Sequence, residues 1–250
     1  MGNYRHIKEF DIKYCDVDFQ DNVKPSTVLA YLEEVACTSA DELGFGYQYV
    51  KPRNMAFMVT NVQCVFHKPV PLGTKMRVVT WPLPPSYVTF GREYQIFVGD
   101  NEKCVDASSR WCLVDVISGK LLQSKAIEGQ DYSTYNRARA LDVANWKIPV
   151  FALTEGELCY QFTVRNSEYD HNMHVNNTRY ADYCFNCFSL EELKKYNLQA
   201  FSISYVRQCH ENDVLRFYRK EVEPGKYLVQ GVNEKEEIVV QSSIVFEGNA

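Results

Sequence analysis

The fold and the candidate chemistry of this sequence are decided by one stretch, Tyr169-Asp170-His171-Asn172-Met173-His174-Val175-Asn176-Asn177. It carries a carboxylate, a carboxamide and an imidazole at every second residue: Asp170, Asn172 and His174. An apolar helix face follows, at positions i, i+4, i+7 and i+8: Tyr180, Cys184, Cys187 and Phe188. The first N–H groups of a helix lack partners inside it, so they can face a developing oxyanion. The stretch therefore predicts a hydrolytic site at the start of a helix, with Asn176 or Asn177 as N-cap.

Composition limits the class of protein. The 250 residues are 46% hydrophobic and 14% aromatic, enough for one large domain or two small ones with a real core. The net charge of −5 argues against broad nucleic-acid binding. No apolar run approaches the roughly 18 residues of a membrane span, and the N-terminus has no apolar signal core. Nine cysteines at no disulfide-framework spacing predict a reduced, cytoplasmic protein.

The order of predicted elements occurs twice. The first half reads as a strand over 7–15, a helix from Pro25 to near Gly44 or Gly46, and strands near 56–66, 75–81, 87–98 and 105–116. The second half reads as a strand over 158–164, a helix to about Tyr196, and strands near 201–207, 214–222, 227–232 and 238–246. We therefore expect an α+β protein made of two fused strand–helix–strands units.

A shift of 150 residues aligns the two halves. It lays Phe10 on Tyr160, Asp18 on Glu168, Asn22 on Asn172 and Cys37 on Cys187. In this register Gln20 opposes Asp170, and Lys24 opposes His174. Only the second half then holds the full polar set, which predicts one active site per chain. We expect a first unit at 1–130, a connector at 131–156 and a second unit at 157–250.

These features resemble a known family. A duplicated helix wrapped by an antiparallel sheet, with Asp-x-Asn-x-His-Val-Asn-Asn (170–177) before the second helix, is similar to the acyl-acyl carrier protein (ACP) thioesterases. Those are double hotdog enzymes, and the likeness is to bacterial members that lack a plastid targeting extension. The likeness spans nearly the whole chain, through three further motifs: Leu43–Gly46, Trp111–Leu121 and Tyr205–Cys209.

The resemblance implies two tandem hotdog units, each a long helix wrapped by an antiparallel sheet. It implies hydrolysis of fatty acyl thioesters on ACP, with the first unit binding the acyl chain and the second holding the site. ACP is the implied partner, and no cofactor is implied. A fused repeat already supplies the paired helices that single hotdog chains gain by dimerising, so both a monomer and a homodimer are compatible with it.

Four residues are the candidate catalytic set. Asp170 is expected to act as base or as nucleophile, although an aspartate there can also simply satisfy turn amides. Asn172 would hold Asp170 or donate to the substrate oxygen, unless it is only a turn asparagine. His174 would polarise the carbonyl or carry a proton to the leaving thiolate. Gln208 stands where the family usually has glutamate, and its amide can position water but cannot accept a proton.

The remaining candidates have weaker signals. The expected substrate-binding residues are the following: Val175, Asn176, Asn177 and Cys209. A buried thiol is the more common state of a cysteine such as Cys209 than a nucleophile is. His171 and His174 make a poor ligand set, and Cys184-x-x-Cys187 lies on an apolar helix face, so no metal site is expected.

Two other functions remain open. An acyl-coenzyme A thioesterase would use the same fold with a different carrier. A non-catalytic hotdog module that binds acyl thioesters is compatible with the missing carboxylate at Gln208.

Overall fold

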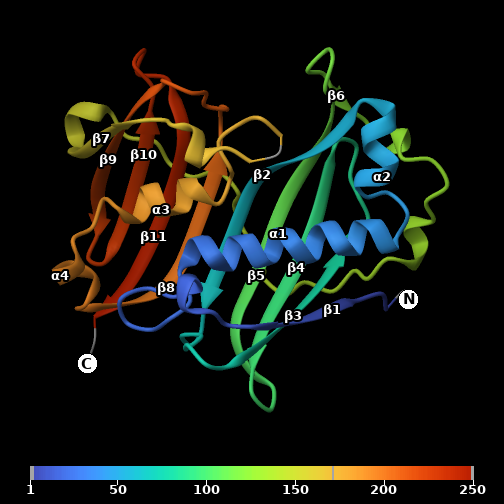
Figure 1. The fold of residues 1–250 in the computed structure, drawn as a ribbon, viewed down its shortest axis with the longest axis horizontal. Coiled ribbons are helices and arrows are strands. Elements are labelled where there is room, and N and C mark those ends of the chain that lie inside the picture. The colour runs from blue at the N-terminus through green and yellow to red at the C-terminus, as the bar shows by residue number, and fades with distance from the viewer. Residues whose placement is uncertain (1–2, 171, 249–250) are drawn as a thin grey trace. The chain divides into compact units, whose positions relative to one another are not determined.

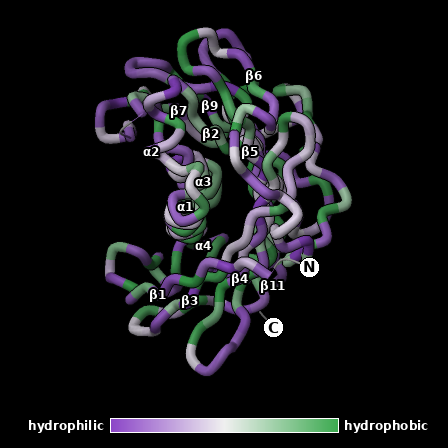
Figure 2. Tube along the Cα trace, turned by 90° about the vertical axis from the view of Figure 1, so that its right-hand side faces the viewer, coloured by the Kyte–Doolittle hydropathy of each residue, from purple (hydrophilic) through white to green (hydrophobic). Residues whose placement is uncertain are grey.

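The computed structural model describes residues 3–170 and 172–248, and the chain divides into two compact units, Met1–Val143 and Ala144–Ala250. Each unit is an antiparallel sheet with one face covered by helix (Figure 1). Along the strands apolar and polar residues alternate, which Figure 2 shows as changes between green and purple along the tube. None of the helices in the described residues combines the length and apolar composition that a membrane span requires.

The first unit is built on a sheet in the order β1-β3-β4-β5-β2, with a short β6 beside β5. Its strands are β1 (His6–Asp11), β2 (Met55–Phe66), β3 (Lys75–Pro82), β4 (Thr89–Val98), β5 (Glu102–Asp115) and β6 (Leu121–Leu122). Its helices are α1 (Pro25–Glu42) and α2 (Tyr47–Val50), with 3₁₀ turns at Tyr14–Asp16, Lys51–Arg53, Ser124–Ala126 and Tyr132–Thr134.

Helix α1 has the start, end and buried face that the sequence predicts. Pro25 occupies the first helical position, where its missing N–H costs nothing. Gly44, with φ of 79°, stops the helix because its backbone adopts the left-handed conformation easily. The predicted inward residues are all buried: Val28, Leu29, Leu32, Val35 and Ala36. Each fully buried Val or Leu contributes about 1.5–3 kcal/mol, so this face fixes α1 on the sheet.

The second unit repeats this topology. Its sheet order is β8-β11-β10-β9-β7, the same connectivity as β2-β5-β4-β3-β1 in the first unit. Its strands are β7 (Glu157–Thr163), β8 (Tyr196–Tyr205), β9 (Val214–Glu223), β10 (Lys226–Val232) and β11 (Ile238–Gly248). Its helices are α3 (Arg179–Phe185) and α4 (Leu190–Leu193), with 3₁₀ turns at Leu153–Glu155 and Asn166–Glu168. Identical strand order in both halves confirms the predicted duplication.

The register of the duplication is 152 residues, so the predicted shift of 150 is wrong. The N–H of Asp18 donates to the carbonyl of Asn22, as that of Asp170 does to His174. Single-residue bridges pair Val17 with Val23 and Tyr169 with Val175. The buried face of α1 maps onto this buried set: Tyr180, Ala181, Cys184, Cys187 and Phe188. Cys37 is not on the buried face of α1, so its identity with Cys187 at 150 residues was accidental.

The corrected register changes what the first unit lacks. Asp18 is the counterpart of Asp170, Gln20 of Asn172 and Asn22 of His174. The predictions that Gln20 opposes Asp170 and that Lys24 opposes His174 are therefore wrong. The first loop keeps the carboxylate and lacks the imidazole.

The second helix is shorter than predicted. Helix α3 ends at Phe185, α4 covers only Leu190–Leu193, and Tyr196 already begins β8. Ser189 begins the second piece, because its hydroxyl accepts the N–H of Glu192 at 3.2 Å while its own N–H donates to the Glu192 carboxylate at 2.8 Å. This capping box starts a new helix. The apolar spacing through Phe188 hid it in the sequence.

Both ends of the predicted connector are fixed to a unit. The carboxylate of Glu93 on β4, which is 0% exposed, accepts from Arg139 at 3.0 Å and from the N–H of Ala140 at 3.0 Å. Further on, the N–H of Phe151 donates to the Gln230 side chain at 2.8 Å, inside the second unit. The segment therefore closes the outer face of each sheet.

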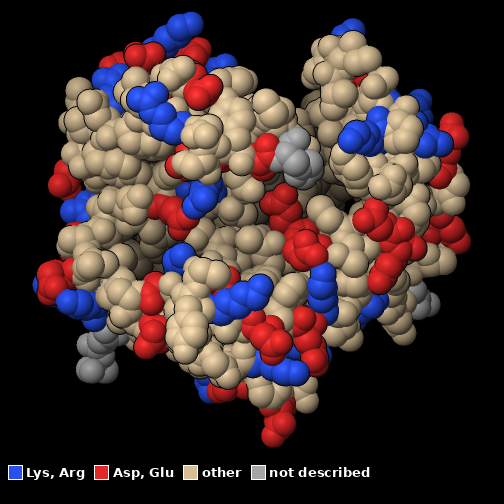
Figure 3. Space-filling model, in the orientation of Figure 1, with Lys and Arg blue, Asp and Glu red and all other residues tan. Residues whose placement is uncertain are grey.

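Charged side chains of both signs are mixed on one face of the molecule. On the face shown in Figure 3, Lys and Arg lie among Asp and Glu, and no single-sign field covers either unit. This distribution fits the small net charge of −5.

Replacing Glu93 by alanine tests how far the buried carboxylate stabilises the first unit. Glu93→Ala should lower the free energy of unfolding by about 3 kcal/mol, because hydrogen bonds to a charged group contribute roughly 1.5–3 kcal/mol each. Urea unfolding followed by tryptophan fluorescence measures it. The exposed Glu9→Ala should change stability by less than about 0.5 kcal/mol. Equal losses in the two variants would contradict this role.

Candidate active site

The loop before α3 is closed by its own backbone. The N–H of Asp170 donates to the carbonyl of His174 at 3.0 Å, and the N–H of Met173 donates to the carbonyl of Asp170 at 3.2 Å. Met173 takes the left-handed conformation, with φ of 63°, and its side chain is exposed. These bonds bring Asp170 and His174 close together.

The turn places Asp170 beside His174. One carboxylate oxygen of Asp170 lies 3.7 Å from Nδ1 of His174, and the other accepts the N–H of Asn172 at 2.7 Å. The side chains of Asp170 and His174 are 10% and 18% exposed, so both are largely withdrawn from water. The carboxylate satisfies a turn amide and faces the imidazole at once, so the two interpretations of Asp170 are compatible.

Nδ1 of His174 faces acceptors only. It lies 3.1 Å from the carbonyl of Val175 as well as 3.7 Å from the Asp170 carboxylate. A proton on Nδ1 satisfies both contacts, so the neutral ring carries its lone pair on Nε2. Nε2 is then the atom that can take and return a proton.

The asparagines of the loop behave differently from one another. Asn172 contacts Asp170 through its backbone N–H, and its side chain is exposed. The side-chain oxygen of Asn176 accepts the N–H of Thr178 at 2.8 Å, and its carbonyl accepts the N–H of Arg179 at 3.0 Å. The N-cap of α3 is Thr178, so the prediction of Asn176 or Asn177 as N-cap is wrong, and Asn176 instead occupies the amides of Thr178 and Arg179. The expectation that the first helix amides are free is wrong for Thr178 and Arg179.

Two predicted substrate-binding residues are buried. The side chain of Val175 is 2% exposed and that of Cys209 is 1% exposed. Burial raises the pKa of the Cys209 thiol to about 11, and the neighbouring Tyr180 phenol is also protonated because burial raises its pKa. Cys209 is thus a protonated core thiol at neutral pH, as are the buried Cys184 and Cys187.

Gln208 lies outside the pair. The strand that was expected to reach Arg207 ends at Tyr205, and Gln208 is exposed in the loop that follows. Among the described residues no hydrogen bond joins Gln208 to Asp170 or His174. Its loop is nevertheless tied to the site, because the N–H of Glu211 donates to the Tyr169 hydroxyl at 2.5 Å.

Sequence reasoning missed a second set of contacts at the helix start. The Tyr183 hydroxyl donates to the Glu168 carboxylate, and Arg179 lies 3.9 Å from the same carboxylate. The backbone carbonyl of Glu168 also accepts the N–H of Asn176 at 2.9 Å. These contacts hold α3 against the loop that carries Asp170 and His174. The only available signal was the spacing of Glu168 and Tyr183 on either side of the polar triplet.

Metal ligation was not expected from the sequence. Among residues 3–170 and 172–248, no group of three or more His, Cys, Asp or Glu side chains is placed to hold a metal ion. His171, considered with His174 in the sequence, lies outside the described residues.

Comparison with known proteins identifies relatives of both units. The family model of the acyl-ACP thioesterase N-terminal domain matches residues 3–123, and that of the C-terminal domain matches residues 152–248. A chloroplastic palmitoyl-acyl carrier protein thioesterase of Gossypium hirsutum is 23% identical over 219 residues, which are 84% of this chain and 53% of that protein. The chain thus spans about half the length of the curated relatives it matches.

Solved structures confirm the predicted fold. An acyl-ACP thioesterase from Bacteroides thetaiotaomicron has a TM-score of 0.89 at 21% identity, covering 97% of this chain and 98% of that one. A 12:0-ACP thioesterase from Umbellularia californica has a TM-score of 0.88 at 16% identity, with 100% of both chains covered. At these identities the likeness shows the double hotdog fold.

The state of Cys209 can be tested by thiol labelling. At pH 7.5 a maleimide should modify the exposed Cys15 fully while Cys209 stays unmodified, because the buried thiol forms little thiolate. Peptide mass spectrometry measures both, and in denaturant the two should react alike. Labelling of Cys209 at the rate of Cys15 in the folded protein would contradict the assignment.

Proposed function

Because the chain belongs to the acyl-ACP thioesterase family, we propose that it hydrolyses fatty acyl thioesters on acyl carrier protein to free fatty acid and carrier thiol. The observation that carries the proposal is the closed loop of the second unit, with the Asp170 carboxylate 3.7 Å from the imidazole of His174. A carboxylate that orients an imidazole is a common arrangement for proton transfer in acyl transfer.

In the proposed mechanism His174 moves the protons. Water attacks the thioester carbonyl carbon while Nε2 of His174 takes its proton. The C–S bond then breaks, and the imidazolium returns that proton to the leaving thiolate. Asp170 keeps Nδ1 protonated and stabilises the imidazolium. This assigns Asp170 an orienting role, which differs from both the base and the nucleophile that the sequence left open.

The loop also offers a donor for the developing oxyanion. The backbone N–H of Asn177 has no acceptor among the described residues, whereas the amides of Thr178 and Arg179 are occupied. We assign the oxyanion to this amide, with the exposed side chain of Asn172 as a second donor. Gln208 would position the attacking water from its neighbouring loop.

The first unit supports a division of roles. Its loop has the same closure, with the N–H of Gln20 donating to Asp18 at 2.8 Å, but Asn22 stands in place of His174. A loop of this shape with a carboxylate alone has no group to shuttle the proton. We propose that the first unit, within residues 1–130, binds the acyl chain, and that the second, within 157–250, performs the chemistry in the cytoplasm.

Replacing either member of the pair should remove most activity. Asp170→Asn and His174→Ala should each lower kcat for acyl-ACP by about 100- to 10,000-fold, the usual contribution of a positioned proton-transfer group. Release of the carrier thiol, followed with a thiol reagent, measures it.

The first loop provides matched controls. Asp18→Asn removes the same negative charge from the same kind of turn, and Asn22→Ala mirrors His174→Ala. Both should keep kcat within about threefold of wild type. A loss in Asp18→Asn equal to that in Asp170→Asn would assign Asp170 a purely structural role.

The carrier is tested with matched substrates. Acyl-ACP and acyl-coenzyme A of equal chain length, from eight to eighteen carbons, should differ in kcat/KM by at least about tenfold in favour of ACP, because only ACP offers a protein surface to bind. Equal values would favour the coenzyme A alternative. Tight binding of either thioester without thiol release over hours would identify a non-catalytic binding module.

A further inference from the structure

A buried arginine lies inside the first unit, between α1 and the sheet. Arg92 on β4 is 5% exposed, and its Nη1 donates to the hydroxyl of Ser39 on α1 at 2.9 Å and to that of Thr80 on β3 at 3.3 Å. These neutral hydroxyls are the hydrogen-bond partners of the guanidinium among the described residues. Arg92 therefore brings a full positive charge into the interior of the unit.

No carboxylate neutralises this charge. Among the described residues no ion pair includes Arg92, and the titratable groups whose charges would act on it most strongly are the following: Tyr4, Tyr94, Tyr135 and Cys37. Desolvation raises the pKa of each of these four groups, so they are neutral at pH 7. The guanidinium is thus held among phenols and a thiol.

A second polar group beside Thr80 lacks a partner. His6 pairs with Thr80 across β1 and β3, so their side chains lie on the same face of the sheet. His6 is 8% exposed, its Nδ1 lies 3.0 Å from Glu42, and its buried Nε2 has no hydrogen-bond partner. Glu42 itself is half exposed and is occupied by His6 and the Tyr4 hydroxyl.

The second unit shows that the fold does not require this polar cluster. Glu93 and Gln230 each accept the N–H groups of the incoming connector, which aligns β4 with β10. With Glu93 aligned on Gln230, Arg92 aligns with Val229. The strand neighbours of β4 and β10 align as well, so Phe217 stands where the first unit has Thr80. Both replacements are 0% exposed. The same positions are filled by apolar side chains in one unit and by a cation with its hydroxyls in the other.

Isolated buried charges are costly, and apolar replacement of buried ionic groups is often neutral or stabilising. A cation that the fold does not need and that no carboxylate neutralises is the expected form of an anion-binding site.

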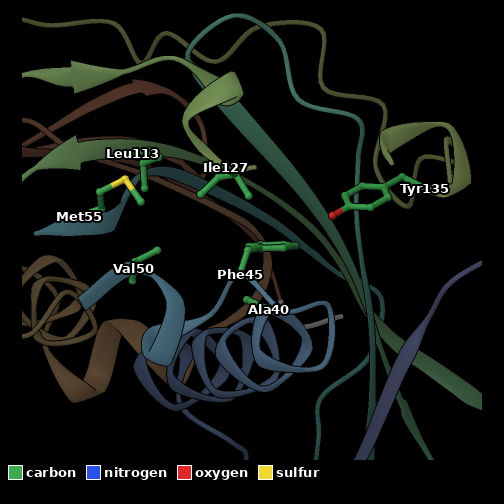
Figure 4. Close-up of a cluster of buried hydrophobic side chains, with 7 residues drawn as sticks. All are labelled: Ala40, Phe45, Val50, Met55, Leu113, Ile127 and Tyr135. Carbon is green, nitrogen blue, oxygen red and sulfur yellow. The ribbon is translucent and has the colours of Figure 1, made fainter. Parts of the chain in front are cut away.

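An apolar cluster adjoins the cation. Ala40 follows Ser39, which accepts from Arg92, and belongs to a cluster of buried side chains drawn from α1, α2, β2, β5 and the loops beside them (Figure 4). The other members of that cluster are Phe45, Val50, Met55, Leu113, Ile127 and Tyr135. In Figure 4 the ring of Tyr135 points its hydroxyl toward these side chains. A polar end and an apolar region therefore meet inside one unit.

We propose that the first unit binds an alkyl carboxylate, with the carboxylate at Arg92 and the chain against this apolar cluster. Bidentate pairing with a guanidinium suits a carboxylate, and the hydroxyls of Ser39 and Thr80 hold the guanidinium in place. Two molecules carry this chemistry: a free fatty acid, which is the product of the proposed function, and an acyl thioester with a carboxylate at its far end. The binding site itself does not depend on the proposed function. Only the choice of these two molecules as its ligands rests on that function.

Binding of dodecanoate, measured by calorimetry at pH 8, tests the proposal without turnover. Wild type should bind dodecanoate at least tenfold more tightly than methyl dodecanoate, which has the same chain without the charge. Arg92→Met should reduce this preference to less than threefold. Arg77→Met is the matched control, because Arg77 lies on the same sheet with its guanidinium over the Phe97 ring and should keep the preference.

Two further measurements localise the site. His174→Ala should keep the preference for dodecanoate, since the site is not the catalytic loop, and this holds even if Arg92→Met does not fold. Arg92→Met should melt no lower than wild type if the cation serves binding. Equal binding of acid and ester by wild type, an unchanged preference in Arg92→Met, or loss of the preference in His174→Ala would each overturn the proposal.

Hydrolysis separates the two sources. If the ligand is a far-end carboxylate of the substrate, 12-carboxydodecanoyl thioesters should show a lower KM than dodecanoyl thioesters, and Arg92→Met should remove the difference. Equal KM values together with dodecanoate binding assign the site to the free acid. Absence of thiol release from every substrate would refute the proposed function and leave the binding result standing.

Discussion

The turn before each helix is closed by the same backbone hydrogen bonds, and the chemistry depends on what that closed turn presents. In both units the N–H of an aspartate donates to the carbonyl four residues later, and its carboxylate accepts an N–H two residues ahead. The closure brings the side chains at positions one and five of the turn together. In the second unit these are Asp170 and His174; in the first they are Asp18 and Asn22. The two turns therefore share their backbone hydrogen bonds. They differ at the fifth position, where the second turn has the imidazole of His174 and the first has Asn22.

Secondary structure and duplication could be predicted because they follow from periodic patterns. The strands of each unit were found to within a few residues, except that β8 begins at Tyr196 rather than near Phe201. Pro25 and Gly44 mark the ends of α1 through their own backbone preferences. The break after Phe185 could not be found the same way, because Cys187 and Phe188 continue the helical period up to Ser189, the N-cap of α4. The apolar period favours one continuous helix, whereas the capping box of Ser189 favours a new helix start. In the structure the hydrogen bonds of the capping box prevail.

The site was predicted in part. Asp170 and His174 do meet, but the roles of Asn176, Val175 and Cys209 depend on which atoms are already occupied or buried, and spacing carries no such information. The register of the repeat failed for a similar reason. An identity between Cys37 and Cys187 outweighed a pattern of buried positions that only the structure displays. The burial of both Arg92 and Glu93 could not be predicted from the sequence. Adjacent residues of a strand point to opposite faces of the sheet, so one of the two is expected to face solvent. Here α1 covers one face of β4 and residues 138–141 cover the other, so both are buried.

The two units share one topology and differ in two places, the turn before the helix and the interior beneath it. In the second unit Phe217 and Val229 are fully buried, and the turn holds Asp170 beside His174. In the first unit the turn has no imidazole at the matching position, and Arg92 donates to neutral hydroxyls in the interior. A turn at the mouth of a helix accepts polar side chains at little cost, because its own amides and carbonyls satisfy them. An interior position does not, because an unpaired cation loses its hydration there. The greater cost of the interior change makes Arg92 the more informative of the two differences about what the first unit holds.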